Sequence, residues 1–240
     1  MQVHADRVSV DGPHGTLLPS TSFTVSSGEF ALVHGDPGTG LTAFGLALAG
    51  RLRPTTGRIT LDGSPDAAAL RRQVAVVDAP GVSEPEEALA LRVVVGEELA
   101  LAGRQADRES VLRWLAEHDV AAYADTRFEN VAPATRTRLL CALAASRRDV
   151  RMLVLDRPDR HTSDVDNWSM LAQEHAERGL AVVVLTATVP HSALPCPSAR
   201  IGAHEQPPPQ RCTPEGTDAA EPVVEEETVE PQETTEGEKL

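Results

Sequence analysis

The chain has 240 residues and a formal net charge of −14, from 36 acidic and 22 basic side chains. Residues 206–240 hold ten acidic and two basic side chains, so a strongly acidic segment follows a mildly acidic body. This charge disfavours nucleic acid as a partner, because binding to a phosphate backbone requires clustered cations.

Cysteine usage and apolar runs predict a cytoplasmic chain. The three cysteines, at positions 141, 196 and 212, have neither a disulfide framework nor zinc-ligand spacing, which favours a reducing compartment. No secretory signal pattern follows Met1, and the longest apolar run, 180–187, is too short to span a bilayer.

Strand-like and helix-like segments alternate along the body. Residues 2–10 and 21–25 alternate apolar and polar side chains, which predicts half-buried antiparallel strands. The elements expected next are strands at 30–33, 58–61, 74–77, 151–155 and 180–185, and helices at 42–49, 93–101, 109–117, 134–146 and 165–177. This order predicts an α/β fold with a parallel sheet core, an antiparallel β subdomain and an inserted helical subdomain over about 83–130, here called the helical insert.

The composition changes at residue 203. Three prolines at 207–209 precede a stretch rich in Glu, Thr and Pro that contains no aromatic residue. Such a segment cannot bury enough apolar surface to offset the entropy lost on ordering. We therefore expect a folded domain at 1–202 and an acidic, disordered tail at 203–240.

A glycine-rich segment joins the strand expected at 30–33 to the helix expected at 42–49. It consists of Gly35, Asp36, Pro37, Gly38, Thr39, Gly40, Leu41, Thr42 and Ala43. A phosphate-binding loop has the pattern G-x-x-x-x-G-K-[ST], whose backbone N–H groups and helix N-terminus bind phosphate oxygens. Leu41 takes the place of the lysine. The glycines alone fit an ordinary turn between a strand and a helix equally well.

The order of segments over about 1–202 resembles the nucleotide-binding domain of the ATP-binding cassette (ABC) transporter family. The segments that carry the resemblance are 27–29 (SGE), 49–50 (AG), 54–59 (PTTGRI), 61–63 (LDG), 131–138 in the place of the signature motif, and 152–158 (MLVLDRP) in the place of the Walker B strand. The resemblance implies a P-loop NTPase-type fold that binds ATP and Mg²⁺, works as a head-to-tail dimer and couples to a membrane permease.

Several residues on which the chemistry of this family depends are replaced. By resemblance, Thr42 and Asp156 would hold magnesium, whereas Arg157 stands in the usual general-base position and cannot accept a proton. The other replacements are Asp78 or Ala79 for a glutamine, Thr186 or Ala187 for a histidine, and Ala132, Pro133 and Ala134 for the serine and glycines of the signature. No catalytic residue is therefore assigned, and both composite sites of a dimer would be damaged.

The arginines leave alternatives open. The guanidinium of Arg157 could reach a phosphate, or it could be exposed or paired with Asp159 or Asp36. For the other clustered arginines, including Arg136 and Arg147, we expect a solvated face.

Together these features predict an ATP-binding subunit of an ABC-type transporter or membrane complex that binds ATP and Mg²⁺ weakly and hydrolyses ATP slowly or not at all. Two alternatives are a nucleotide-independent pseudo-cassette that scaffolds a membrane protein and a residual ATPase that energises transport. The implied partners are a multi-span permease, contacted through the helical insert at the cytoplasmic face of the membrane, and a second nucleotide-binding domain in a homodimer or heterodimer.

Overall fold

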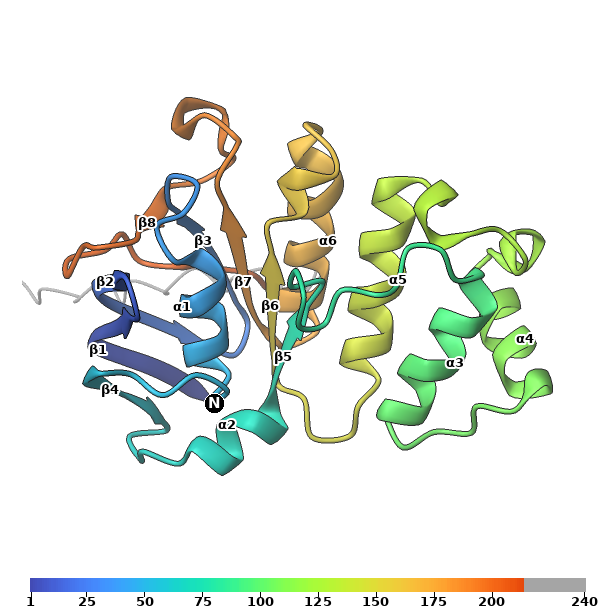
Figure 1. Cartoon of the computed structure of the whole chain (residues 1–240), viewed down its shortest axis with the longest axis horizontal. Coiled ribbons are helices and arrows are strands. Elements are labelled where there is room, and N and C mark those ends of the chain that lie inside the picture. The colour runs from blue at the N-terminus through green and yellow to red at the C-terminus, as the bar shows by residue number, and fades with distance from the viewer. Residues whose placement is uncertain (214–240) are drawn as a thin grey trace, which may run out of the picture.

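The structure, a computed structural model, describes residues 1–213 and consists of two sheets and a group of helices (Figure 1). The first sheet is 3-stranded and antiparallel, with the strand order β2-β1-β4. Its strands are β1 (Gln2–Gly12), β2 (Gly15–Ser26) and β4 (Thr56–Leu61). The antiparallel β subdomain predicted from the alternating side chains is confirmed.

The second sheet is 6-stranded, with the order β5-β6-β7-β3-β8 and with β9 pairing to β3. Its strands are β3 (Glu29–His34), β5 (Val74–Val77), β6 (Met152–Asp156), β7 (Ala181–Thr186), β8 (Ser198–Arg200) and β9 (Gln210–Arg211). All pairs except that of β9 are parallel. The carboxyl ends of β3, β5, β6 and β7 therefore meet at one edge, here called the carboxyl edge.

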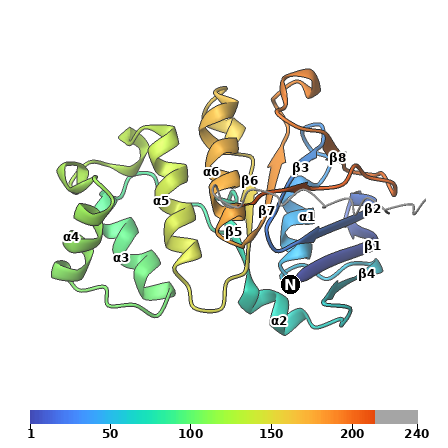
Figure 2. The same ribbon diagram turned by 180° about the vertical axis from the view of Figure 1, so that it is seen from behind.

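Helices cover both faces of this parallel sheet. The α-helices of residues 1–213 are α1 (Leu41–Leu48), α2 (Ala67–Gln73), α3 (Leu91–Leu101), α4 (Arg108–Glu117), α5 (Pro133–Ala145) and α6 (Val165–Glu177). Short 3₁₀ turns lie at Ala121–Tyr123, Phe128–Asn130, Pro158–Arg160 and His191–Ala193. Opposite views show α1 and α6 on opposite faces of the sheet (Figures 1 and 2).

Side chains of the parallel strands alternate between two apolar cores. On β3, Phe30 and Leu32 join the core that contains α5, α6 and the helical insert. Ala31 and Val33, between them, join the core shared by α1 and the antiparallel sheet. Because both faces are buried, these strands are nearly continuous apolar runs, as parallel sheets require.

The helical insert contains α3 and α4, which lie beside α5 and away from both sheets (Figure 1). Buried Leu91, Val95, Leu115 and Phe128 connect these elements to the core of α5 and α6. Within residues 1–213, no helix combines the length and apolarity needed to cross a bilayer.

The expected start of the disordered tail at residue 203 is wrong. Residues 203–213 are described, and β9 pairs with the first residues of β3. The side-chain amide of Gln206 also donates to the carbonyls of Ser22, Arg200 and Ala203. Composition does not reveal this order, because backbone pairing at a sheet edge needs few apolar side chains. The remainder of the predicted tail, 214–240, lies outside the described residues.

The expectation of a solvated arginine face is also wrong for Arg136. This side chain is buried, and its guanidinium lies 4.5 Å from the centroid of the Phe128 ring. It also pairs with Glu87 at 3.3 Å. Arg147, just beyond the end of α5, pairs with Glu98 of α3 at 3.0 Å. These arginines attach α5 to the helical insert, since each one satisfies a carboxylate across the contact.

Candidate functional site

The glycine-rich segment connects β3 to α1 at the carboxyl edge, where the sequence predicts a phosphate-binding loop. Gly38 and Gly40 have left-handed backbones, with φ of 86° and 91°. The hydroxyl and the N–H of Thr39 both donate to the carbonyl of Asp36, which closes a tight turn. Asp36, Pro37 and Gly38 are exposed. The loop therefore has the strand–turn–helix context that backbone phosphate binding requires.

Gly40 has a second constraint, because the backbone of β2 lies directly against it. A Cβ atom added at Gly40 would collide with the carbonyl of Leu17, whereas one added at Gly38 would meet nothing within 4 Å. Substitutions at Gly40 would therefore disturb the contact between the loop and β2. Gly38 is the better position for testing the loop alone.

Leu41 begins α1, and its side chain is only 5% exposed. It joins the core beneath the loop, together with Phe44 and Ala47 of the same helix. The position at which the phosphate-loop pattern has a lysine therefore carries no charge towards the loop. What α1 presents there is its first N–H groups, which have no partner inside the helix.

Arg157 lies between two of the predicted site residues. Its Nε donates to Oδ1 of Asp156 at 2.9 Å, and its Nη2 donates to the hydroxyl of Thr42 at 3.2 Å. Of the pairings expected for Arg157, those with Asp159 and Asp36 are therefore wrong, since its partners are Asp156 and Thr42. The structure brings Thr42 and Asp156 together, as predicted for metal ligands, but it does so around an arginine.

These residues, as arranged, do not fit a magnesium ion. Magnesium requires oxygen ligands at about 2.0–2.1 Å. An ion at that distance from Oδ1 of Asp156 and the Thr42 hydroxyl would lie against the guanidinium that binds the same oxygens. Two cations so close repel each other strongly away from bulk water.

The chain after β6 is also bound to the end of β7. One carboxylate oxygen of Asp159 accepts from the hydroxyls of Thr186 and Thr188 and from the N–H groups of Ala187 and Thr188. Burial raises the pKa of Asp159, but these hydrogen bonds outweigh burial and hold its pKa below the ordinary value. Thr186 and Ala187, at the place expected for a histidine, therefore bind Asp159.

A third connection joins the chain after β6 to the end of β5. Asp78 pairs with Arg160 at 3.0 Å and with His161 at 3.0 Å, and Arg160 also pairs with Glu84. The carboxylates of Asp78 and Glu84 and a ring nitrogen of His161 lie within 4.8 Å of one another, as metal ligands can. However, Arg160 already supplies the positive charge that both carboxylates need. The sequence analysis missed Arg160 and His161, although they follow closely on the predicted strand at 151–155.

The segment in the place of the signature motif offers few donors. Ala132 precedes α5 without a side-chain capping bond, and Pro133 occupies the first turn and has no N–H. Both residues are exposed. Ala132 and Pro133 would therefore offer a phosphate group of a second subunit neither a hydroxyl nor a glycine backbone.

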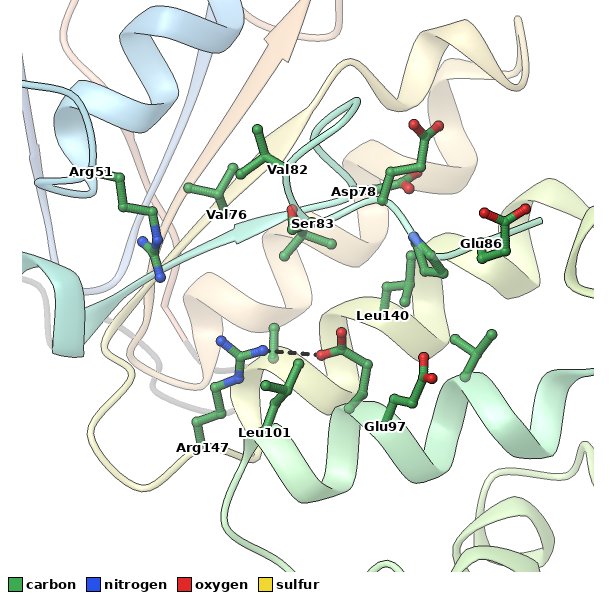
Figure 3. Close-up of a pocket in the computed structure, with 16 residues that line it drawn as sticks. Arg51, Val76, Asp78, Val82, Ser83, Glu86, Glu97, Leu101, Leu140 and Arg147 are labelled. Atoms are coloured by element: carbon green, nitrogen blue, oxygen red, sulfur yellow. Dashed lines mark hydrogen bonds and ion pairs between the residues drawn. The ribbon is translucent and has the colours of Figure 1, made fainter. Parts of the chain in front are cut away.

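A cavity of about 410 Å³ lies between the end of β5, α3 and α5 (Figure 3). Acidic side chains line it, among them Glu86 and Glu97, together with Arg51 and Arg147. Val82 and Leu101, at 54% and 69% exposed, add apolar surface to it. We call this cavity the acidic groove.

The fold and the glycine-rich loop define a nucleotide-binding domain of the P-loop class. The model of the ABC transporter family matches residues 18–160, and the chain belongs to this family. Members of the family generally bind ATP with Mg²⁺, dimerise and pair with transmembrane subunits.

Solved structures agree with this assignment of the fold. A nucleotide-free ATP-binding cassette from an ABC transporter is similar with a TM-score of 0.58 and 14% identity, over 78% of this chain and 82% of that one. The ATP-binding subunit of an ABC transporter is similar with a TM-score of 0.56 and 18% identity, over 78% of this chain and 80% of that one. No curated protein matches the sequence.

Replacing Asp159 tests the connection between β6 and β7. We expect Asp159→Ala to lower the free energy of unfolding by roughly 2–4 kcal/mol, because it leaves the buried hydroxyl of Thr186 and the part-buried N–H groups of Ala187 and Thr188 without an acceptor. Because the folded-state pKa of Asp159 is lowered, the stability that its carboxylate supplies is complete above its ordinary pKa and is lost as the pH falls through the folded-state pKa.

Urea denaturation at neutral and acidic pH measures both effects. Asp149→Ala, at an exposed position, is the matched control and should change stability by less than about 0.5 kcal/mol. If Asp159→Ala lowered the free energy of unfolding as little as this control does, the hydrogen bonds of Asp159 would not stabilise the carboxyl edge.

Proposed function

We propose that this chain is the ATP-binding subunit of an ABC-type transporter or membrane complex, and that it binds ATP weakly and hydrolyses it slowly or not at all. The observation that supports this proposal is the arrangement of charged side chains beside the loop. The backbone keeps the turn that phosphate binding requires, but Leu41 is buried and the charge of Arg157 is paired with Asp156.

The missing lysine sets the expected loss of affinity. A hydrogen bond to a charged group contributes about 1.5–3 kcal/mol, which corresponds to roughly one to two decades in dissociation constant. The N–H groups of the first turn of α1, and those of the loop other than Gly35 and Thr39, remain available to phosphate oxygens. We therefore expect ATP to bind, with a dissociation constant near the millimolar range.

Hydrolysis lacks a general base. Arg157 cannot accept a proton at the position of the family's glutamate. The nearby carboxylate of Asp159 accepts four hydrogen bonds on Oδ2, and its Oδ1 is buried, so neither oxygen is exposed to a water molecule at the loop. The loss of a general base removes about two to four decades of rate. Pairing with a second subunit cannot easily restore hydrolysis, because Ala132, Pro133 and Ala134 of the signature segment replace the serine and glycine donors as well.

Thermal melting with ATP tests binding at the loop. At a concentration of ATP about five times the dissociation constant, the gain in stability is about 1 kcal/mol, which is roughly 2–4 °C for a chain of this size. We expect this shift in the wild type and its loss in Gly38→Asp, which adds a negative charge to the loop without a steric contact.

Gly38→Asn is the matched control, because it has the same size and backbone requirement as Gly38→Asp but no charge. It should keep most of the shift. The absence of any shift in the wild type would contradict ATP binding and would favour a nucleotide-independent pseudo-cassette.

Phosphate release tests the second part of the proposal. We expect the wild type to release phosphate from ATP no faster than Asp156→Asn, because neither protein has a general base in place. The measurement is a coupled phosphate assay at millimolar ATP with purified protein. A wild-type rate at least about tenfold above that of Asp156→Asn would instead support a residual ATPase.

We further propose that a transmembrane partner docks at the acidic groove, which the helical insert helps to form. Glu98 pairs with Arg147 across the groove, as the dashed line in Figure 3 shows. Glu86 and Glu97 line the same groove and form no ion pair within residues 1–213. With the exposed Val82 and Leu101 beside them, they suit an amphipathic segment that carries a basic side chain.

Charge reversal in the groove tests this docking. We expect Glu97→Lys to lower the fraction of the chain that sediments with membranes of its native host, because a basic partner segment would be repelled. Glu174→Lys is the control, since Glu174 is exposed on α6 and lies outside the groove. Equal sedimentation of both variants and the wild type would contradict docking at this groove.

A further inference from the structure

The guanidinium of Arg157 is the cation that the structure places between Thr42 and Asp156. It binds Oδ1 of Asp156 at 2.9 Å and the hydroxyl of Thr42 at 3.2 Å. The two contacted residues come from different elements, the end of β6 and the first turn of α1. The arginine thus connects the same two groups that were predicted to share a magnesium ion.

The backbone at Arg157 supports a specific role for this contact. Its φ of 51° and ψ of 61° place a non-glycine residue in the left-handed region, which is uncommon and costs free energy. Such a conformation persists only where the surrounding contacts compensate for it. Here it turns the side chain back towards its neighbour Asp156 and across to α1.

The buried charge of Asp156 favours keeping Arg157 in this position. The side chain of Asp156 is fully buried, and a buried carboxylate requires a counter-charge. Arg157 supplies that charge from the next position in the chain, with its own side chain 29% exposed. A divalent ion bound to Oδ1 of Asp156 and to the Thr42 hydroxyl would have to displace the guanidinium and leave this arginine unpaired.

The guanidinium keeps donors for a ligand. Of its five N–H donors, one on Nε and one on Nη2 form the two bonds described, which leaves three. Because the head group is partly exposed and next to the first turn of α1, these donors lie where phosphate oxygens would approach the loop. Arginine suits phosphate because its planar donors match the oxygen geometry.

We propose that Arg157 takes the place of the divalent cation at this site, so that the loop binds nucleoside triphosphates in their metal-free form. This inference rests on the proposed binding of ATP at the loop. It differs from that proposal in its consequence, because it makes binding independent of Mg²⁺. It also predicts that the metal dependence of the site is restored when the arginine is removed.

Isothermal titration with ATP, in EDTA and in excess Mg²⁺, tests the inference. The wild type should bind in EDTA at least as tightly as in Mg²⁺. Arg157→Ala should bind ATP about tenfold more weakly than the wild type in EDTA. Excess Mg²⁺ should raise the affinity of this variant at least about threefold, because Thr42 and Asp156 become free to hold the ion. Arg178→Ala is the control, since Arg178 is an exposed arginine on the surface beyond α6.

The inference would be overturned if the wild type bound ATP only in the presence of Mg²⁺. It would also be overturned if the affinity of Arg157→Ala for ATP were as independent of Mg²⁺ as that of the wild type. If neither protein binds ATP in either condition, the proposed function fails instead. The inference is then tested by a second measurement, which uses the wild type without nucleotide and does not need a folded variant.

That measurement is the NMR signal of the Nε–H of Arg157 in the wild type, assigned by through-bond correlation. The hydrogen bond to Asp156 should keep this proton protected and its resonance unchanged when millimolar Mg²⁺ is added. A shift or loss of the resonance with Mg²⁺ would show that the ion displaces the guanidinium, and would overturn the inference.

Discussion

The carboxyl edge depends on the hydrogen bonds of the short segment that follows β6. Arg157 binds this segment to α1, Asp159 to the end of β7, and Arg160 and His161 to the end of β5. Parallel strands share no turns, so their ends are held in register only by the sheet itself and by contacts such as these. The five residues 157–161 therefore fix the positions of α1, β5 and β7, which are far apart in sequence, relative to β6.

These bonds use the groups that would otherwise be available for chemistry. The carboxylates of Asp156, Asp159 and Asp78 each have a partner within the chain, as do the guanidinium groups of Arg157 and Arg160. A site in which every charge already has a partner gains less from a charged ligand than one with free charges, because binding must compete with contacts that already exist. This physical reason for the proposed weak binding of ATP is independent of the missing lysine.

Periodicity and segment order predict most of the fold. The strand at Val74–Val77 and the helix at Val165–Glu177 have the bounds expected from the sequence. The family match over residues 18–160 confirms the ABC resemblance. Helix α2 and strand β9 were not predicted, because neither has a periodic pattern of apolar side chains. The side chain of Asp66 caps α2, and backbone pairing with β3 holds β9. The partner of Arg157 could not be predicted either, since it depends on a left-handed backbone that the sequence does not indicate.

The pairing of β9 with β3 brings the two ends of the described chain to one turn. The N–H of Ser27 donates to the carbonyl of Met1, and the N–H of Cys212 donates to the carbonyl of Gly28. Both ends thus lie at the turn before β3, at the opposite end of this strand from the glycine-rich loop. Residues 1–213 nearly form a closed ring, so a short linker could join Met1 to Thr213 and new termini could be opened at an exposed hairpin. In this architecture the order of the elements along the chain could therefore be changed without changing the geometry of the carboxyl edge.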